Sequence, residues 1–174
     1  MHYLHRVLVT VDTNESRDDK IKSARSEAEY QTEDFYGTVW DWRETETAGR
    51  WADEYPINVI LASDNVDRFV DEMIDCRNSQ IEFIKRMMCM AKEKISLDIG
   101  NMDDAEVIEE NYNKPYNVGF YGLKSALEIL TGTYTSNSCF YDTENGDSKI
   151  TPELIKQVRS SPERYALVIF DYHN

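Results

Sequence analysis

The chain has 174 residues, of which 41% are apolar and 30% are charged. Asp and Glu number 33 against 19 Lys and Arg, so the formal net charge is −14. Non-specific nucleic-acid binding and adhesion to anionic lipid both need a cationic face, so this composition disfavours both classes. No apolar run approaches the ~20 residues of a membrane-spanning helix. Length and composition predict a single domain over residues 1–174 with a sizeable core.

The cysteines Cys76, Cys89 and Cys139 are odd in number, and none forms a C-x-x-C spacing. A disulfide framework is therefore disfavoured, and free thiols in a reducing cytosol are expected. The first residues lack the long apolar stretch of a secretory signal. We therefore expect a cytoplasmic protein.

The first expected elements are a strand, a polar helix and two short strands. Val7, Val9 and Val11 share one face of an alternating run, which predicts the opening strand. The helix that follows has few apolar anchors, and polar helices of this kind lie on the outside of a domain. The expected ranges are 3–12, 18–35, 39–43 and 58–62.

The strongest helical pattern begins at the capping run 63–65 and ends near Gly100. Apolar residues recur along it at three- and four-residue steps. A continuous helix of about 30 residues would measure ~45 Å. A break near residues 77–79 is left open.

Helices and strands intermingle in the last part of the chain without the regular alternation of a doubly wound sheet. Thr151 and Pro152 form a helix start, with the threonine at the cap and the proline at the first helical position. The expected elements are helices at 116–130 and 151–160 and strands at 133–141 and 165–172, the last apolar enough to be central. The predicted fold class is α+β, a mixed or antiparallel sheet with helices packed on it and one long central helix.

Histidines near both chain ends form one candidate site. If the first and last strands pair antiparallel, His2, His5, Asp171 and His173 come together, and such ligands suit Zn²⁺ or another divalent metal. His2 and His5 differ by three positions, however, so they point to opposite faces of a regular strand. The alternative is a group of surface residues at the chain ends. This alternative is favoured, so no metal and no cofactor are expected.

Catalytic signatures are missing from the sequence. It contains no G-x-S-x-G, G-x-x-x-x-G-K-[ST] or G-x-G-x-x-G motif. With 33 carboxylates, close acidic pairs arise by chance and single out no general acid or base. A non-enzymatic protein is therefore expected.

An acidic stripe runs along the expected long helix. Its four aspartates step by three, four and four residues, which places them on one face, about 6 Å apart along the axis. That spacing is too sparse to copy duplex DNA but resembles the phosphates of one extended strand. The alternative is a solvated helix face favoured by the N-terminal dipole. The stripe is Asp64, Asp67, Asp71 and Asp75, and a second acidic run holds Asp103, Asp104, Glu106, Glu109 and Glu110.

All three tryptophans lie between residues 36 and 51. Tryptophan and arginine are enriched at interface hot spots, which makes this segment a candidate recognition surface. The alternative is a structural corner in which large rings cover the edge of the core. The candidate anchors are Trp40, Trp42, Arg50 and Trp51.

Three short segments resemble a type of phage and mobile-element protein. These segments are Trp40-Asp41-Trp42, Gly49-Arg50-Trp51 and Asp171-Tyr172-His173. The resembling proteins are small, carry a W-D-W…G-G-R-W segment and end in V-D-Y/C-H. Here Ala48 replaces the first glycine, and the spacer 43–47 is polar rather than aromatic. The resemblance implies a phage or mobile-element origin, in which small acidic proteins are often anti-defence inhibitors, anti-CRISPR proteins among them.

These observations predict a non-enzymatic acidic interaction protein in the cytoplasm of a bacterial host. The expected partner is a basic protein, for example the nucleic-acid-binding surface of a CRISPR effector nuclease, which the chain would occupy as a DNA mimic. Sequence-specific nucleic-acid binding and membrane association are not expected. A homodimer on the apolar stripe of the long helix is a further expectation. Two alternatives are a metal-dependent enzyme at the terminal His/Asp cluster and a small-nucleotide-binding protein.

Overall fold

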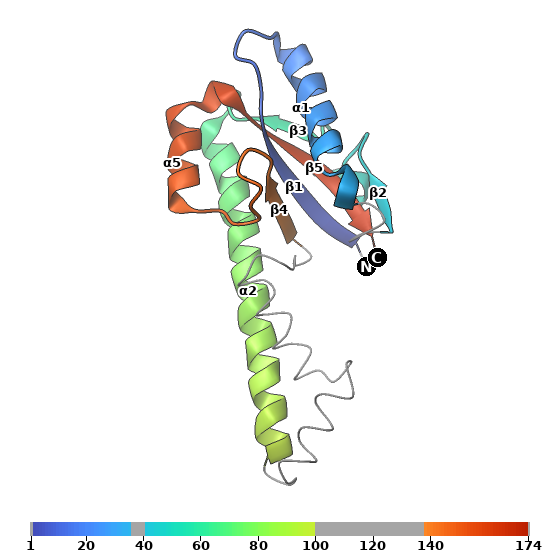
Figure 1. Cartoon of the computed structure of the whole chain (residues 1–174), viewed down its shortest axis with the longest axis vertical. Helices are drawn as coiled ribbons and strands as arrows, with labels where there is room; N and C mark the ends of the chain where they lie inside the picture. The colour runs from blue at the N-terminus through green and yellow to red at the C-terminus, as the bar shows by residue number, and fades with distance from the viewer. Residues whose placement is uncertain (1, 36–40, 100–137, 174) are drawn as a thin grey trace. The chain divides into compact units, whose positions relative to one another are not determined.

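A computed structural model describes residues 2–35, 41–99 and 138–173 (Figure 1). The predictions for 36–40 and 100–137, the helix at 116–130 among them, lie outside the described residues. The chain divides into two compact units, Met1–Asn78 with Asn137–Asn174 and Ser79–Ser136. The single domain expected over the whole chain stays a prediction. The first unit contains the sheet and the sites considered below.

A five-stranded mixed sheet forms the centre of the first unit. The order is β2-β5-β1-β4, and β3 pairs with the same edge of β5 as β2. β1 and β5 are antiparallel over their full length, whereas β4 is parallel to β1. The α+β class and the antiparallel pairing of the first and last strands are thus confirmed. The strands are β1 (His2–Thr10), β2 (Trp42–Glu44), β3 (Val59–Leu61), β4 (Ser138–Asp142) and β5 (Tyr165–His173).

Both faces of the sheet are buried, because apolar residues occupy alternate positions on both sides of β1 and β5. Leu8 and Ile169 point to the face covered by α2 and α5. Val7 and Phe170 point to the opposite face, which α1 covers. This is why β5 could be predicted as a central strand. The helices are α1 (Arg17–Gln31), α2 (Val66–Ile99) and α5 (Pro152–Ser160).

The helices begin at the caps that the sequence predicts. The hydroxyl of Thr151 accepts from the backbone N–H of Leu154 at 3.1 Å, and Asn65 accepts from that of Arg68 at 3.0 Å. α2 has 34 residues and is continuous through 77–79, so the break left open by the sequence does not occur. These caps matter because each satisfies an otherwise unpaired N–H of the first helical turn.

β2 and β3 are two halves of one edge strand. β2 lies opposite residues 171–173 of β5 and β3 opposite 166–168, while the chain between them leaves the sheet and returns. The buried Asn58 amide donates to the carbonyls of Thr45 at 2.9 Å and Ile169 at 3.3 Å, and its oxygen accepts from Arg25 of α1 at 2.8 Å. One side chain therefore holds both ends of the excursion and joins them to α1.

A buried ion pair links β1 to α2. The Nε and Nη2 atoms of Arg6, a residue only 6% exposed, both lie 2.6 Å from Oε1 of Glu72. The hydroxyl of Tyr55 donates to the same oxygen at 2.7 Å, and Nη1 of Arg6 donates to Ser138 at 3.0 Å. Burial and the bond to Glu72 raise the pKa of Tyr55. Because these residues come from four segments far apart in the sequence, the pair fixes how those segments pack.

Cys76 and Cys139 are free thiols, as the sequence predicts, and both are buried. Burial raises the pKa of Cys76 and keeps it protonated. The side chain of Cys89 lies outside the described part of α2.

Replacing Glu72 with Gln leaves the charge of Arg6 buried without a counter-charge. We expect the free energy of unfolding, measured by urea denaturation, to fall by about 3–5 kcal/mol. Glu82→Gln is the matched control in the same helix, because Glu82 pairs with Lys85 at 2.7 Å on an exposed surface. The control should change stability little. Equal effects of the two substitutions would show that the buried Arg6–Glu72 pair contributes no more to the free energy of unfolding than the exposed pair does.

Candidate functional site

The C-terminal end of β5 brings together the segments that the sequence singled out. Trp42 lies opposite His173 in the ladder between β2 and β5, and the N–H of Asp41 donates to the carbonyl of His173 at 3.1 Å. The N–H of Arg50 donates to Oδ2 of Asp171 at 3.1 Å. The D-W, G-R-W and D-Y-H segments therefore form one structural unit. Trp40 lies outside the described residues.

Asp171 is a buried carboxylate that contacts both the N-terminal strand and the G-R-W segment. The residue is 1% exposed, and its Oδ1 lies 2.9 Å from Nδ1 of His2. Gly49 packs directly against it with a φ of +54°, and a Cβ at this position would collide with the Asp171 side chain. Gly49 is thus required both by its backbone conformation and by the close approach of the carboxylate. The glycine of the G-R-W segment has a structural role.

Gly49→Ala should lower the free energy of unfolding by about 2–4 kcal/mol, because a left-handed backbone and overpacking both add cost. Gly146→Ala is the matched control, since Gly146 has a φ of +64° but a Cβ added there would meet nothing within 4 Å. The control should lose only ~1 kcal/mol. Chemical denaturation followed by circular dichroism measures both. Similar losses would mean that contact with Asp171 is unimportant.

Two histidines lie side by side above Asp171. The rings of His2 and His173 have centroids 4.9 Å apart, and the His2 ring meets Trp42 edge-on at 6.1 Å. Nδ1 of His173 lies 3.2 Å from a carboxylate oxygen of Asp41. Each imidazole thus faces its own carboxylate through Nδ1. These contacts connect the ends of β1, β2 and β5, and the exposed Trp42 packs against the His2 ring.

The metal set expected as an alternative, His2, His5, Asp171 and His173, is only partly assembled. His5 is 2% exposed and packs against Tyr172 on the opposite face of the sheet, with ring centroids 4.8 Å apart. The alternation of side chains along β1 separates it from His2. Within residues 2–35, 41–99 and 138–173, no group of three or more His, Cys, Asp or Glu is arranged to hold a metal ion.

His5 is a buried histidine whose Nδ1 has no hydrogen-bond partner among the described residues. Burial, helped by the nearby charge of Arg6, lowers its pKa to about 3. A histidine in the unfolded chain takes up a proton near pH 6.5. Between these two values the unfolded state binds more protons, so this residue makes stability fall as pH falls.

We expect His5→Phe to weaken the acid sensitivity of folding. Phenylalanine keeps a flat ring beside Tyr172 but cannot be protonated. From pH 6 to pH 4 the wild type should lose about 1.4 kcal/mol of stability per pH unit more than the variant. Urea denaturation at a series of pH values measures this difference. Parallel stability curves would contradict the expectation.

The aspartate stripe on α2 is only half available. Asp64 binds Arg17 at 2.8 Å and Asp67 binds Arg159 at 2.6 Å, so two of the expected negative charges are neutralised. Both arginines come from helices distant in the sequence, and partner binding by the four aspartates stays a prediction. Asp71 and Asp75 are exposed, and neither forms an ion pair with a described residue. The expected second run, Asp103, Asp104, Glu106, Glu109 and Glu110, lies outside the described residues.

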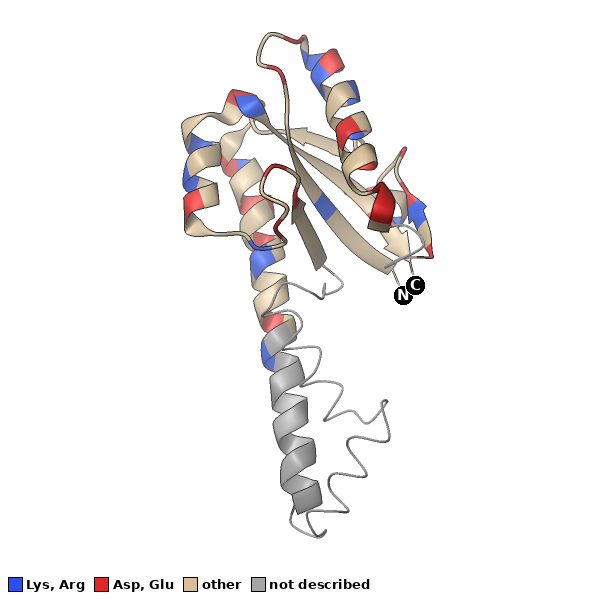
Figure 2. Cartoon of the chain, viewed as in Figure 1, with Lys and Arg blue, Asp and Glu red and all other residues tan. Residues whose placement is uncertain are grey.

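Further acidic residues lie along the C-terminal half of α1, the turn that follows it, and the segment around β2 (Figure 2). These segments adjoin, since Thr45 donates to Glu29 at 2.5 Å and Arg43 binds Glu33 at 2.7 Å. Between residues 27 and 46 the chain has seven carboxylates and one Arg or Lys, Arg43. We call this the α1–β2 acidic surface; it consists of Glu27, Glu29, Glu33, Asp34, Asp41, Glu44 and Glu46. A count of charges along the sequence could have found it.

The aromatic candidates divide between two roles. Trp51 is half-buried and packs against the core, as the structural-corner alternative proposed. Trp42 is 43% exposed, and Arg50 is exposed while its backbone is fixed by Asp171. Trp42 therefore remains the candidate anchor, and it adjoins Asp41 of the α1–β2 acidic surface.

Comparison with known proteins found no matching family, no matching curated sequence and no matching solved structure. In the described part of the chain, no helix has the length and apolar character needed to cross a membrane.

Proposed function

We propose that the chain is a non-enzymatic interaction protein that binds a basic partner through the α1–β2 acidic surface, with Trp42 as its apolar anchor. The proposal rests on the exposed Trp42, which lies within a stretch, residues 27–46, that holds seven carboxylates and one arginine, Arg43. A second exposed arginine, Arg50, lies at the same end of the sheet. Excess charge of one sign attracts and orients a partner of the opposite sign. An exposed indole then supplies contact area of the kind that dominates interface hot spots.

Rigid support for Trp42 favours a binding role over a merely exposed ring. β2 is hydrogen-bonded to β5, and the indole meets the ring of His2, which the buried Asp171 holds in turn. An anchor that is ordered before binding loses less conformational freedom when the partner arrives. Next to Trp42 in the sequence, the carboxylate of Asp41 lies 3.2 Å from Nδ1 of His173.

We further propose that the partner is a nucleic-acid-handling enzyme whose basic channel receives this surface. Channels that follow a phosphate backbone are lined by positive charge. The resemblance to phage and mobile-element proteins makes a CRISPR effector nuclease the first partner to test, with the chain acting as an anti-CRISPR DNA mimic in a bacterial host. Asp71 and Asp75 are exposed on α2, which covers the opposite face of the sheet from α1, so they would form a separate negative area.

The test is binding to a purified effector nuclease across a series of salt concentrations. Affinity should fall as salt rises from ~50 mM to ~500 mM, because exposed charges are screened over a shorter distance. Trp42→Ala should weaken binding by roughly 30-fold, about 2 kcal/mol, at every salt concentration. Calorimetry or a competition assay with labelled guide-bound DNA measures both effects.

Charge variants separate this surface from the net charge of the protein. The pair Glu27→Gln and Glu46→Gln should weaken binding and reduce its salt dependence. The matched pair Glu153→Gln and Glu163→Gln removes the same charge from an exposed region on α5 and the turn after it, and should change little. Equal effects of the two pairs, or no binding to any effector, would reject the proposal.

A further inference from the structure

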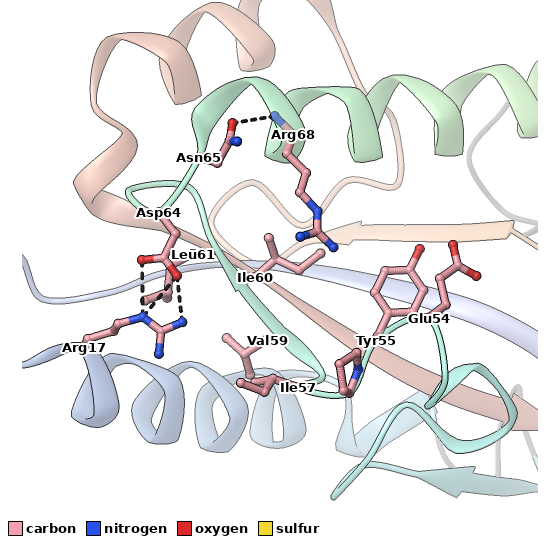
Figure 3. A pocket seen from close by; sticks show the side chains of 11 residues that line it. Arg17, Glu54, Tyr55, Ile57, Val59, Ile60, Leu61, Asp64, Asn65 and Arg68 are labelled. Atoms are coloured by element: carbon pink, nitrogen blue, oxygen red, sulfur yellow. Dashed lines mark hydrogen bonds and ion pairs between the residues drawn. The ribbon is translucent and has the colours of Figure 1, made fainter.

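A small depression of about 200 Å³ lies along β3, between the start of α1 and the start of α2 (Figure 3). Its apolar part includes Pro56, Ile60 and the 49% exposed Ile57. Among the strands that the structure describes, β3 pairs with β5 alone, so its other edge borders this depression. β3 is a short edge strand whose Ile60 is partly exposed, and such an edge is a surface that another chain can contact.

The charges around this depression balance. Arg17 and Asp64 neutralise each other through bonds of 2.8 and 3.1 Å. Arg68 and Glu54 also line the depression, and both are exposed. Neither forms an ion pair with a described residue. Apart from the Arg17–Asp64 pair, the depression is therefore lined by one positive side chain, Arg68, and one negative side chain, Glu54. These charges sum to zero, whereas the net charge of the protein is −14.

We propose that this surface, which we call the β3 patch, joins two copies of the chain in a symmetric dimer. A two-fold interface brings each residue of a patch against the same patch of the other copy. A two-fold axis passing between Arg68 and Glu54 would set the arginine of each copy against the glutamate of the other. Ile57 and Ile60 of both copies would lose their contact with water at the centre.

Charge complementarity favours a second copy over a basic partner here. A basic protein is attracted to the α1–β2 acidic surface, whereas the β3 patch has no net charge to attract it. Two copies that each carry −14 repel one another over distances comparable with the Debye length, ~8 Å at physiological salt. Two copies can approach most readily through a surface without excess negative charge. At the β3 patch, Arg68 of each copy would meet Glu54 of the other. The interface thus differs from the one expected on the stripe of the long helix.

The experiment is sedimentation velocity on the full chain over a roughly hundred-fold range of concentration. A concentration-dependent dimer is expected, and it should strengthen with salt from ~50 to ~300 mM, because net repulsion is screened more than contacts at short range. The proposed binding of a basic partner has the opposite salt dependence, so either proposal can fail alone. A chain that stays monomeric at all concentrations and salts overturns the dimer.

A charge exchange tests the contact itself. Arg68→Glu alone and Glu54→Arg alone should each weaken the dimer at least ~10-fold, whereas the double variant should recover most of the affinity. A mixture of the two single variants should form heterodimers for the same reason. Lys156→Glu on α5 is the control, with the same charge change at an exposed position. No recovery in the double variant, or equal weakening by the control, overturns the assignment; circular dichroism confirms that each variant is folded.

Discussion

Strand β5 hydrogen-bonds along both of its edges, and this double pairing places nearly every residue of interest. On one edge it runs antiparallel to the whole of β1, which sets His2 opposite His173. On the other edge it holds β2 and β3, which carries Trp42 to the same end of the sheet. A shift of one residue in the β1–β5 ladder would put Asp171 and His2 on opposite faces of the sheet. The candidate site is therefore a consequence of strand register.

The strongly acidic composition coexists with a buried cation, Arg6, whose charge and donors are all matched by partners. Arg6 is held by Glu72 and Ser138, and Glu72 is also bonded to Tyr55. Burial makes that arrangement demanding, since any missing partner would leave a charge or a donor unsatisfied. Surface carboxylates face no such demand. Between residues 27 and 46 the chain has seven carboxylates and one arginine, whereas at the start of α2 both Asp64 and Asp67 pair with arginines.

Local signals in the sequence predicted much of the fold. The caps at Asn65 and Thr151 and the apolar run of β5 each depend on neighbours within a few residues, so they could be identified without tertiary information. The separation of His2 from His5 also followed from the pleat alone. The pairing of Asp64 with Arg17 could not be predicted, because 47 residues separate them. The same is true of Asp67 and Arg159, 92 residues apart.

The site at Asp171 shows why motifs alone were ambiguous. Tryptophan, glycine and histidine segments can mark either a corner of the core or a recognition surface, and here the buried members form such a corner while Trp42 stays exposed. Gly49, Trp51 and Asp171 are needed for packing, whereas Trp42 uses that packing as a support and stays exposed. If Trp42 anchors a partner as proposed, a change in Gly49, Trp51 or Asp171 should weaken binding indirectly, because it loosens the support of the indole. Separating the two roles requires stability and affinity to be measured on the same variants, since only a residue such as Trp42 should alter affinity without altering stability.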